Sequence, residues 1–241
     1  MCKRLFFFTC FLIFLFFNLK SQESRLEIDT FYYQLDTSNY TFAVYKPENA
    51  TYHFQRTKPD SNNNNLLMSV VAAFTSKAPE HIVGTSVSNG KKKIYPTDAE
   101  TAYCLIIGED VKIESLNQNR NISIEKAVKQ KGDYFQQMHL VENGQPKSCE
   151  IFKNRSTFRR ALAQKEGQTH IVETLDRMTI DDFVEVLINL GYEQAIYLDM
   201  GSWSEGWYRD SEDKIVKIGN NWRSSHLQTN WLVIHKNISM K

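Results

Sequence analysis

Short apolar runs and stretches of apolar–polar alternation recur along most of this 241-residue chain, separated by polar turns. Such segments, rich in aromatic and β-branched side chains, are typical of β-strands joined in hairpins. No internal repeat is visible. Strands are expected within residues 25–45 (two strands) and at 66–74, 82–87, 102–107, 111–113, 135–141, 214–218 and 231–235.

One stretch, residues 180–190, has the 3.6-residue periodicity of an amphipathic helix. Thr179 is placed to cap its first turn, and Gly191 to end it in a left-handed conformation. The next run, 195–198, is too short and too apolar for a surface helix, which predicts a buried strand. A second, short helix is expected within 124–131.

Residues 158–164 fit either a helix or a strand. We favour a hairpin that turns at residues 165–168 and returns through 170–172. Many hairpin strands with few helices predict an α+β protein. Its core is expected to be a mixed, largely antiparallel β-sheet with a few packed helices, in a single domain.

The N-terminus has the layout of a secretory signal peptide, because Lys3 and Arg4 precede an apolar run at 5–17. We expect a signal peptide at 1–21 and the folded domain at 22–241, in a secreted or periplasmic protein. The run is short for a membrane span, so no membrane contact is expected after cleavage. An uncleaved anchor is the alternative.

Composition narrows the possible functions. With 41% hydrophobic and 24% charged residues, the chain suits one globular domain with a real core. A net charge of +1 gives no reason to expect nucleic-acid or electrostatic membrane binding. Cys104 and Cys149 either pair in an oxidising compartment or stay as buried thiols. They show no metal-ligand spacing with any histidine, and no metal or cofactor is expected.

The loop after residues 195–198 is dense in polar and aromatic groups. A carboxylate at the end of a buried strand, here Asp199, is held rigidly while it stays within reach of solvent. This position predicts a functional site. The alternative is a tight turn started by Asp199, with Gly201 in an unusual backbone conformation. Trp203 either stacks on a sugar face or closes the core.

Four segments carry a family resemblance. Residues 198–202 (Leu-Asp-Met-Gly-Ser) follow a helix ending in Leu-Gly and a short strand, and resemble a Leu-Asp-Gly-Gly-Gly-Ser motif. Residues 71–74 resemble an Asn-Gly-Gly-Phe segment, Arg160 an arginine that opens a strand, and 226–230 an arginine followed four residues later by asparagine. These are motifs of the phosphodiester glycosidase family, which the chain resembles over about residues 66–235.

The resemblance implies hydrolysis of a glycosyl phosphodiester. Such a reaction expels a phosphate monoester, so it needs a cation for the phosphate and a carboxylate near the anomeric carbon. Arg160 is assigned the first role, with Arg159 as the fallback because adjacent strand residues face opposite sides. Asp199 would act as base or nucleophile, and Glu205 as a second carboxylate. Further substrate-binding candidates are Gly201, Ser202, Trp203, His226 and Asn230.

The chain departs from the family pattern at several of these positions. Met200 and both Ala72 and Ala73 stand where the family has glycine, and His226 where it has arginine. These changes favour a non-catalytic glycan-binding or cell-envelope protein on the same fold, whereas the retained Asp199 and Ser202 favour the enzyme. A glycosidase that does not depend on phosphate is a further alternative. The expected partner is therefore a carbohydrate or a glycosyl phosphate.

Overall fold

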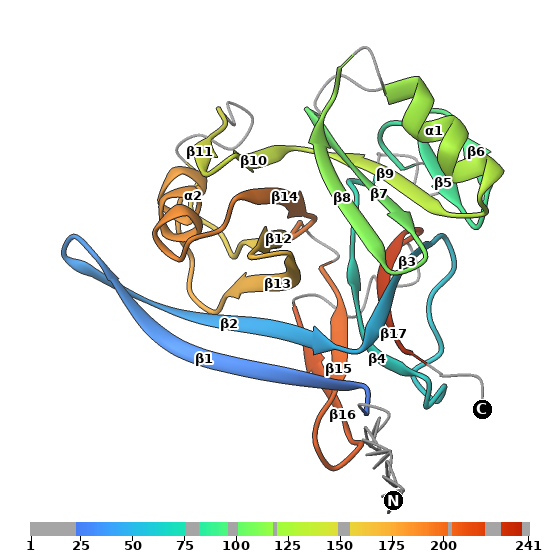
Figure 1. Ribbon diagram of the computed structural model, residues 1–241. Helices are drawn as coiled ribbons and strands as arrows, with labels where there is room; N and C mark the ends of the chain where they lie inside the picture. Colours follow the sequence, from blue (N-terminus) through green and yellow to red (C-terminus); the bar gives the residue numbers. More distant parts are fainter. Residues whose placement is uncertain are drawn as a thin grey trace, which may run out of the picture.

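The computed structural model describes residues 23–75, 82–95, 101–117, 120–148, 155–201, 204–219 and 228–237. Its described residues form three antiparallel sheets and two helices (Figure 1). The expected signal peptide at 1–21 lies outside these residues, so its cleavage stays a prediction. Neither helix of the described chain has the length and hydrophobicity that a membrane-spanning helix requires.

The largest sheet has seven strands in the order β1-β2-β13-β12-β14-β10-β11. The closed end of its long β1–β2 hairpin reaches away from the other two sheets, at the left of Figure 1. The strands are β1 (Arg25–Leu35), β2 (Ser38–Glu48), β10 (His139–Glu142), β11 (Gln145–Pro146), β12 (Arg160–Lys165), β13 (Gln168–Thr174) and β14 (Gln194–Leu198).

Two five-stranded sheets complete the fold. The β4 sheet, in the order β16-β15-β4-β17-β3, contains β3 (Ala50–Gln55), β4 (Leu66–Val71), β15 (Gly206–Arg209), β16 (Ile215–Ile218) and β17 (Trp231–Lys236). The β7 sheet, in the order β6-β5-β9-β7-β8, contains β5 (Ser86–Ser88), β6 (Lys91–Lys93), β7 (Ala102–Ile107), β8 (Asp110–Ser115) and β9 (Asp133–Gln137). Helix α1 (Arg120–Lys129) packs on the β7 sheet.

A central hydrophobic cluster joins the three sheets. Leu198 and Leu162 of the seven-stranded sheet meet Val70 of the β4 sheet and Phe135 of the β7 sheet there. The opposite face of the seven-stranded sheet is covered by α2 (Ile180–Asn189), whose buried Phe183 packs in a second cluster with that face. Strand β14 is therefore buried on both faces.

Helix α2 has the ends that the sequence predicted. The Thr179 side chain accepts a hydrogen bond from the Asp182 backbone N–H at 3.1 Å, as an N-cap does. After the helix, Gly191 has a φ of +82°, the left-handed conformation that glycine adopts without steric cost. This cap ends the helix and turns the chain toward β14, which ends directly before Asp199. The local sequence therefore sets the direction in which the chain approaches Asp199.

The expected fold class is confirmed only in its coarser part. The sheets are antiparallel and one domain is formed, but every pairing of named strands in the described chain is antiparallel, so the sheet is not mixed. With two helices among the described residues, the protein is mainly β. The expected hairpin of 158–172 is present as β12 and β13, and the helical alternative for that segment is wrong.

Several strand boundaries differ from those expected. The single strand expected at 135–141 is two strands, β9 in the β7 sheet and β10 in the seven-stranded sheet. Strand β4 ends at Val71 and not at 74, because the backbone from Ala72 onward leaves the sheet to contact other segments. Strand β5 begins at Ser86, and Ile82 forms only an isolated bridge with Thr75. Both segments are apolar because they are buried. The periodicity of apolar residues in a sequence cannot distinguish a buried segment outside a sheet from a paired strand.

The two cysteines have different outcomes. Cys104 is a free thiol, fully buried in the central cluster, and burial raises its pKa because the thiolate would lose its hydration. Cys149 lies outside the described residues. Buried and uncharged, Cys104 behaves as a small apolar core residue.

Candidate active site

Asp199 is the first residue after β14, where the chain leaves the seven-stranded sheet. Its backbone N–H donates to the carbonyl of Ala72 at 3.0 Å, which ties the end of β14 to the end of β4. Its carboxylate Oδ1 accepts the backbone N–H of Gly201 at 2.8 Å. The turn that the alternative interpretation started at Asp199 therefore exists, and it holds the carboxylate in place. Gly201 does not have a positive φ, so that part of the alternative is wrong.

The Asp199 carboxylate has an unusual acidity. Its surroundings withdraw it from water and raise its pKa from 3.8 to about 6. Hydrogen bonds from the backbone of Gly201 and Thr75, and the charge of Arg160, oppose this shift without cancelling it. A carboxylate that titrates near neutral pH is suited to proton transfer.

Arg160 opens β12, directly opposite Leu198 in the sheet. Its guanidinium is fully buried, and Nε and Nη2 donate to Oε2 of Glu173 at 3.1 and 3.0 Å. The third nitrogen, Nη1, has no hydrogen-bond partner within the described chain. A buried guanidinium with one free nitrogen is costly for the fold alone, but it offers a ligand a charged donor.

Glycine at position 219 keeps the backbone close to Arg160. Gly219 has a φ of +77°, and a Cβ there would lie 1.7 Å from the carbonyl oxygen of Ser204 and 3.3 Å from Nη2 of Arg160. Only a glycine can occupy this position without moving the backbone.

Arg159 faces the other side of the sheet, as strand alternation requires. Its Nε donates to the carbonyl of Met178 at 3.3 Å, and its side chain hydrogen-bonds Tyr197. Met178 and Tyr197 both belong to the cluster beneath α2. Of the two adjacent arginines, Arg160 is thus the one on the face of Leu198.

Asn230 hydrogen-bonds the short segment after β4 that also contacts Asp199. Its fully buried side chain accepts the N–H of Ala73 at 2.6 Å and donates to Oγ1 of Thr75 at 3.3 Å. The same short segment contacts Asp199 through Ala72 and Thr75. Asn230 and Asp199, distant in sequence, therefore hold one stretch of backbone from two sides.

The residues that replace family glycines fill core space. Ala72 and Ala73 are fully buried in the central cluster, and Met200 is buried in the cluster beneath α2. None of these three described residues has a positive φ. The substitutions are therefore compatible with the fold.

Glu205 is separated from this group. Its carboxylate is fully buried and pairs with the Lys58 ammonium at 2.8 Å. That ammonium lies 6.0 Å from the ring centroid of Trp231, in the cluster on the outer face of the β4 sheet. Within the described chain, the Glu205 carboxylate therefore pairs with Lys58 and forms no ion pair with Arg160. The structure thus brings together Asp199, Gly201, Arg160 and Asn230, while Ser202, Trp203 and His226 lie outside the described residues.

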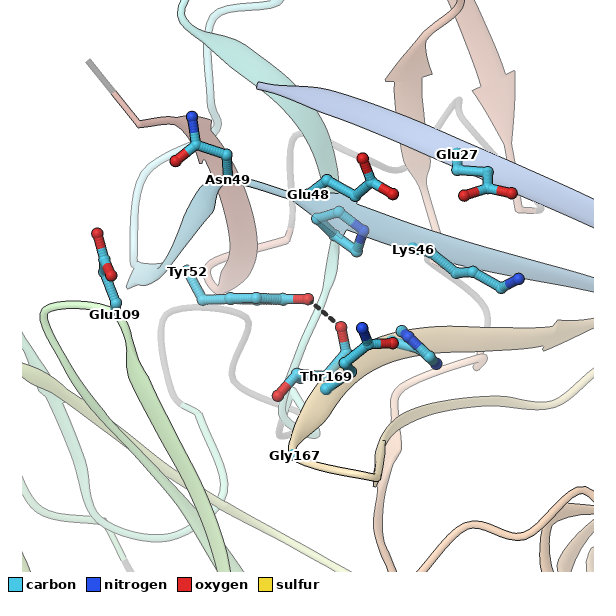
Figure 2. Close-up of a pocket in the computed structure, with 11 residues that line it drawn as sticks. Glu27, Lys46, Glu48, Asn49, Tyr52, Glu109, Gly167 and Thr169 are labelled. Carbon is cyan, nitrogen blue, oxygen red and sulfur yellow. Dashed lines mark hydrogen bonds between the residues drawn. The ribbon is translucent and has the colours of Figure 1, made fainter. Parts of the chain in front are cut away.

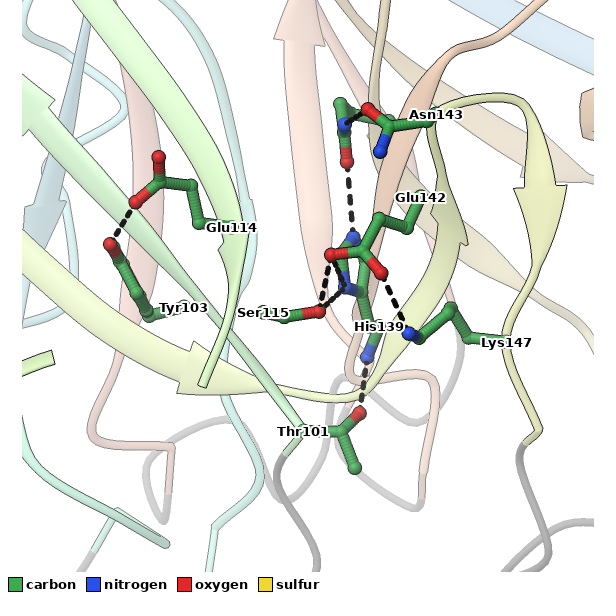
Figure 3. Close-up of polar contacts among 9 residues, drawn as sticks. Thr101, Tyr103, Glu114, Ser115, His139, Glu142, Asn143 and Lys147 are labelled. Atoms are coloured by element: carbon green, nitrogen blue, oxygen red, sulfur yellow. Dashed lines mark hydrogen bonds and ion pairs between the residues drawn. The ribbon is translucent and has the colours of Figure 1, made fainter. Parts of the chain in front are cut away.

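Two other polar features lie apart from this group. His139 is fully buried, and its Nδ1 lies 2.9 Å from Oγ of Ser115, which donates to Glu142 at 2.6 Å (Figure 3). Burial lowers the pKa of His139. Glu142 is paired with Lys147 at 2.7 Å, so the network is internally satisfied and joins strands of two sheets.

A polar cavity of about 560 Å³ adjoins the turn between β12 and β13, at the opposite end of β12 from Arg160. Tyr52 crosses it and donates to the carbonyl of Thr169 at 2.5 Å (Figure 2). Glu27, Glu48 and Glu109 also line this cavity. It is separate from the candidate active site. The described residues contain no cluster of three or more His, Cys, Asp or Glu side chains able to hold a metal.

One substitution tests the turn that positions Asp199. A Cβ at Gly201 would lie 3.0 Å from Oδ1 of Asp199, tighter than ordinary contact. We expect Gly201→Ala to tilt the carboxylate and to weaken the hydrogen bond that it accepts from the backbone N–H of residue 201. Because that bond favours the ionised carboxylate, its loss should raise the pKa of Asp199 further. NMR titration of the Asp199 carboxyl measures this pKa, and an unchanged value would show that the turn does not position the carboxylate.

The fold and the site define a mainly β domain in which a buried arginine and a carboxylate of raised pKa act on each other where β12 begins and β14 ends. The chain belongs to the phosphodiester glycosidase family, whose sequence model matches residues 64–233. This confirms the resemblance expected over about 66–235. Among curated protein sequences, none matches this chain.

Solved structures with a similar fold include the catalytic domain of zebrafish N-acetylglucosamine-1-phosphodiester alpha-N-acetylglucosaminidase, auto-inhibited by its pro-peptide. It is 12% identical, with a TM-score of 0.63 over 88% of this chain and 83% of that one. A hypothetical protein from Synechocystis is 9% identical, with a TM-score of 0.57 over 87% of this chain and 62% of the other. At these identities the likeness concerns the fold.

Proposed function

We propose that this protein hydrolyses the bond between a sugar and the phosphate of a glycosyl phosphodiester. The observation that carries the proposal is the juxtaposition of Arg160, buried with one nitrogen free, and Asp199, whose pKa is about 6. The first offers a charged donor for a phosphate oxygen, and the second a carboxylate that is ionised just above that pH.

The reaction requires few catalytic groups besides these two. A departing phosphate monoester has a last pKa near 6, so its expulsion needs less help from a general acid than an alkoxide does. Nη1 of Arg160 stabilises the charge that develops on the phosphate oxygens. Asp199 either activates a water molecule or attacks the anomeric carbon. Glu205, already paired with Lys58, is assigned no step in this scheme.

The test is sugar release by the purified protein from a panel of sugar-1-phosphate diesters and nucleotide sugars. Simple glycosides of the same sugars, which lack the phosphate, are the matched controls. We expect release from at least one diester and none from its control glycoside. No release from any diester, together with binding to a glycan array, would contradict the proposal and favour a non-catalytic glycan-binding protein on this fold.

A further inference from the structure

Gln137 is the last residue of β9 in the β7 sheet, where the chain crosses to β10 of the seven-stranded sheet that holds Arg160. Arg160 is directly opposite both Glu173 and Leu198 on its two neighbouring strands. On the far side of β14, His139 is opposite Ile196, and the Tyr197 N–H donates to the Met138 carbonyl at 2.9 Å. Continued by one residue, this register places Gln137 opposite Leu198.

Residues directly opposite each other in antiparallel strands project from the same face of the sheet. Leu198 faces the central cluster, and so do Phe135, which precedes Gln137 by two residues, and Ala102, its cross-strand neighbour in the β7 sheet. Gln137 and Arg160 thus both project toward the central cluster, on either side of Leu198. Two strand spacings, about 10 Å, separate their backbones, a distance that two long side chains and one small anion can bridge.

The side-chain amide of Gln137 has one donor group unused. Gln137 is fully buried, and its Oε1 accepts the N–H of Met138 at 2.9 Å. Its Nε2 has no hydrogen-bond partner anywhere in the described part of the chain. The neighbouring Gln136 differs, because its Oε1 accepts the N–H of Thr85 and its Nε2 donates to Tyr134.

Two fully buried side chains that flank Leu198 therefore each keep a nitrogen without a partner among the described residues: Nη1 of Arg160 and Nε2 of Gln137. Such groups destabilise a fold unless a ligand or water satisfies them. We propose that they bind the same oxyanion, the phosphate group of the substrate. The inference rests on the proposed function and adds a specificity-determining residue to it. The guanidinium supplies the charge, and the amide a neutral donor that fixes which oxygen faces it.

Gln137→Met tests the inference, because it keeps the length of the side chain and removes the donor. With inorganic phosphate as the probe in calorimetric titration, we expect at least about a tenfold weaker Kd than for the wild type. For a diester substrate, KM should rise by a similar factor while kcat stays within about threefold, since Asp199 is untouched. Gln137→Glu, which aims a carboxylate at the anion, should abolish phosphate binding.

A matched control separates binding from stability. Gln164 of β12 has a side-chain amide with its donors satisfied by the Val111 carbonyl and Thr169. Gln164→Met should lower the unfolding midpoint and leave the phosphate Kd unchanged. Gln137→Met should also lower the unfolding midpoint, because it removes the oxygen that accepts the Met138 N–H. Only Gln137→Met should weaken phosphate binding, so the phosphate Kd, and not stability, separates the two variants.

The outcomes distinguish this inference from the proposed function. A wild type that binds phosphate more tightly than Gln137→Met but hydrolyses no diester would support the donor pair and contradict the hydrolase. A wild type that hydrolyses diesters, with unchanged phosphate Kd and KM in both Gln137 variants, would overturn the donor pair alone. A wild type that binds no phosphate would also overturn it.

Discussion

Asp199→Asn is expected to reduce diester hydrolysis by about 10³-fold, because the amide can neither accept a proton nor attack the anomeric carbon. The Asn side chain keeps an oxygen for the Gly201 N–H, so the turn should persist. In the wild type, turnover should rise with pH through about 6, where the carboxylate ionises. Steady-state rates from pH 4 to 8 measure both effects.

The same substitution should stabilise the fold at neutral pH. The pKa of Asp199 is higher in the folded chain, about 6, than in the unfolded chain, near the usual 3.8. Between these values the native state holds more protons than the unfolded state, so stability falls as pH rises from about 4 to about 6 and then stays low. Removing the charge should recover up to about 3 kcal/mol above pH 7 and nothing below pH 4.

Denaturant unfolding at pH 4 and pH 7.5 checks this second effect. Asp110→Asn is the matched control, since that carboxylate is exposed at the end of β8. We expect it to change neither turnover nor the pH dependence of stability. An Asp199→Asn protein with full turnover would show that the carboxylate has no part in the reaction, and one without a stability gain at pH 7.5 would contradict the raised pKa.

Arg160→Met is expected to lower both stability and activity, for two separable reasons. Without the guanidinium, the Glu173 carboxylate is left buried and unpaired, which costs about 3–5 kcal/mol of folding free energy. Diester hydrolysis should also fall by at least about a hundredfold, because the phosphate loses its charged donor. Chemical unfolding and kinetics measure the two losses independently.

The double variant Arg160→Met, Glu173→Gln distinguishes them. Removing both charges of a buried pair is often nearly neutral, so most of the stability should return. Hydrolysis should not return, since no donor replaces Nη1. A stable double variant that still hydrolyses diesters at the wild-type rate would favour the alternative in which the enzyme is a glycosidase that does not depend on phosphate.

Local sequence accounts for much of the site's framework. The N-cap at Thr179, the helical periodicity, Gly191 and the apolar run before Asp199 are all interactions between near neighbours. These features can be predicted from the sequence because each depends on residues only a few positions apart. Strand alternation likewise shows that Arg159 and Arg160 face opposite sides.

The sequence did not exclude Arg159 as the fallback for Arg160, and it did not show which groups each side chain would contact. Arg160 faces Leu198 because β12 lies between β13 and β14, a pairing that long-range contacts decide. Glu205 lies only six residues after Asp199, yet its carboxylate pairs with Lys58 from a distant segment. The apolar run at 66–74 gave no sign that β4 would end at Val71, because its last residues are buried without pairing.

The amino-acid order was thus sufficient for the family, the α2–Gly191–β14 unit and the position of Asp199 at a strand end, because each depends on local periodicity, capping or a contiguous motif. Tertiary structure alone decided the pKa of Asp199, the partner of Arg160 and the unused amide of Gln137. Desolvation, ion pairing and the satisfaction of buried donors depend on groups that are far apart in the chain and meet only in the folded core.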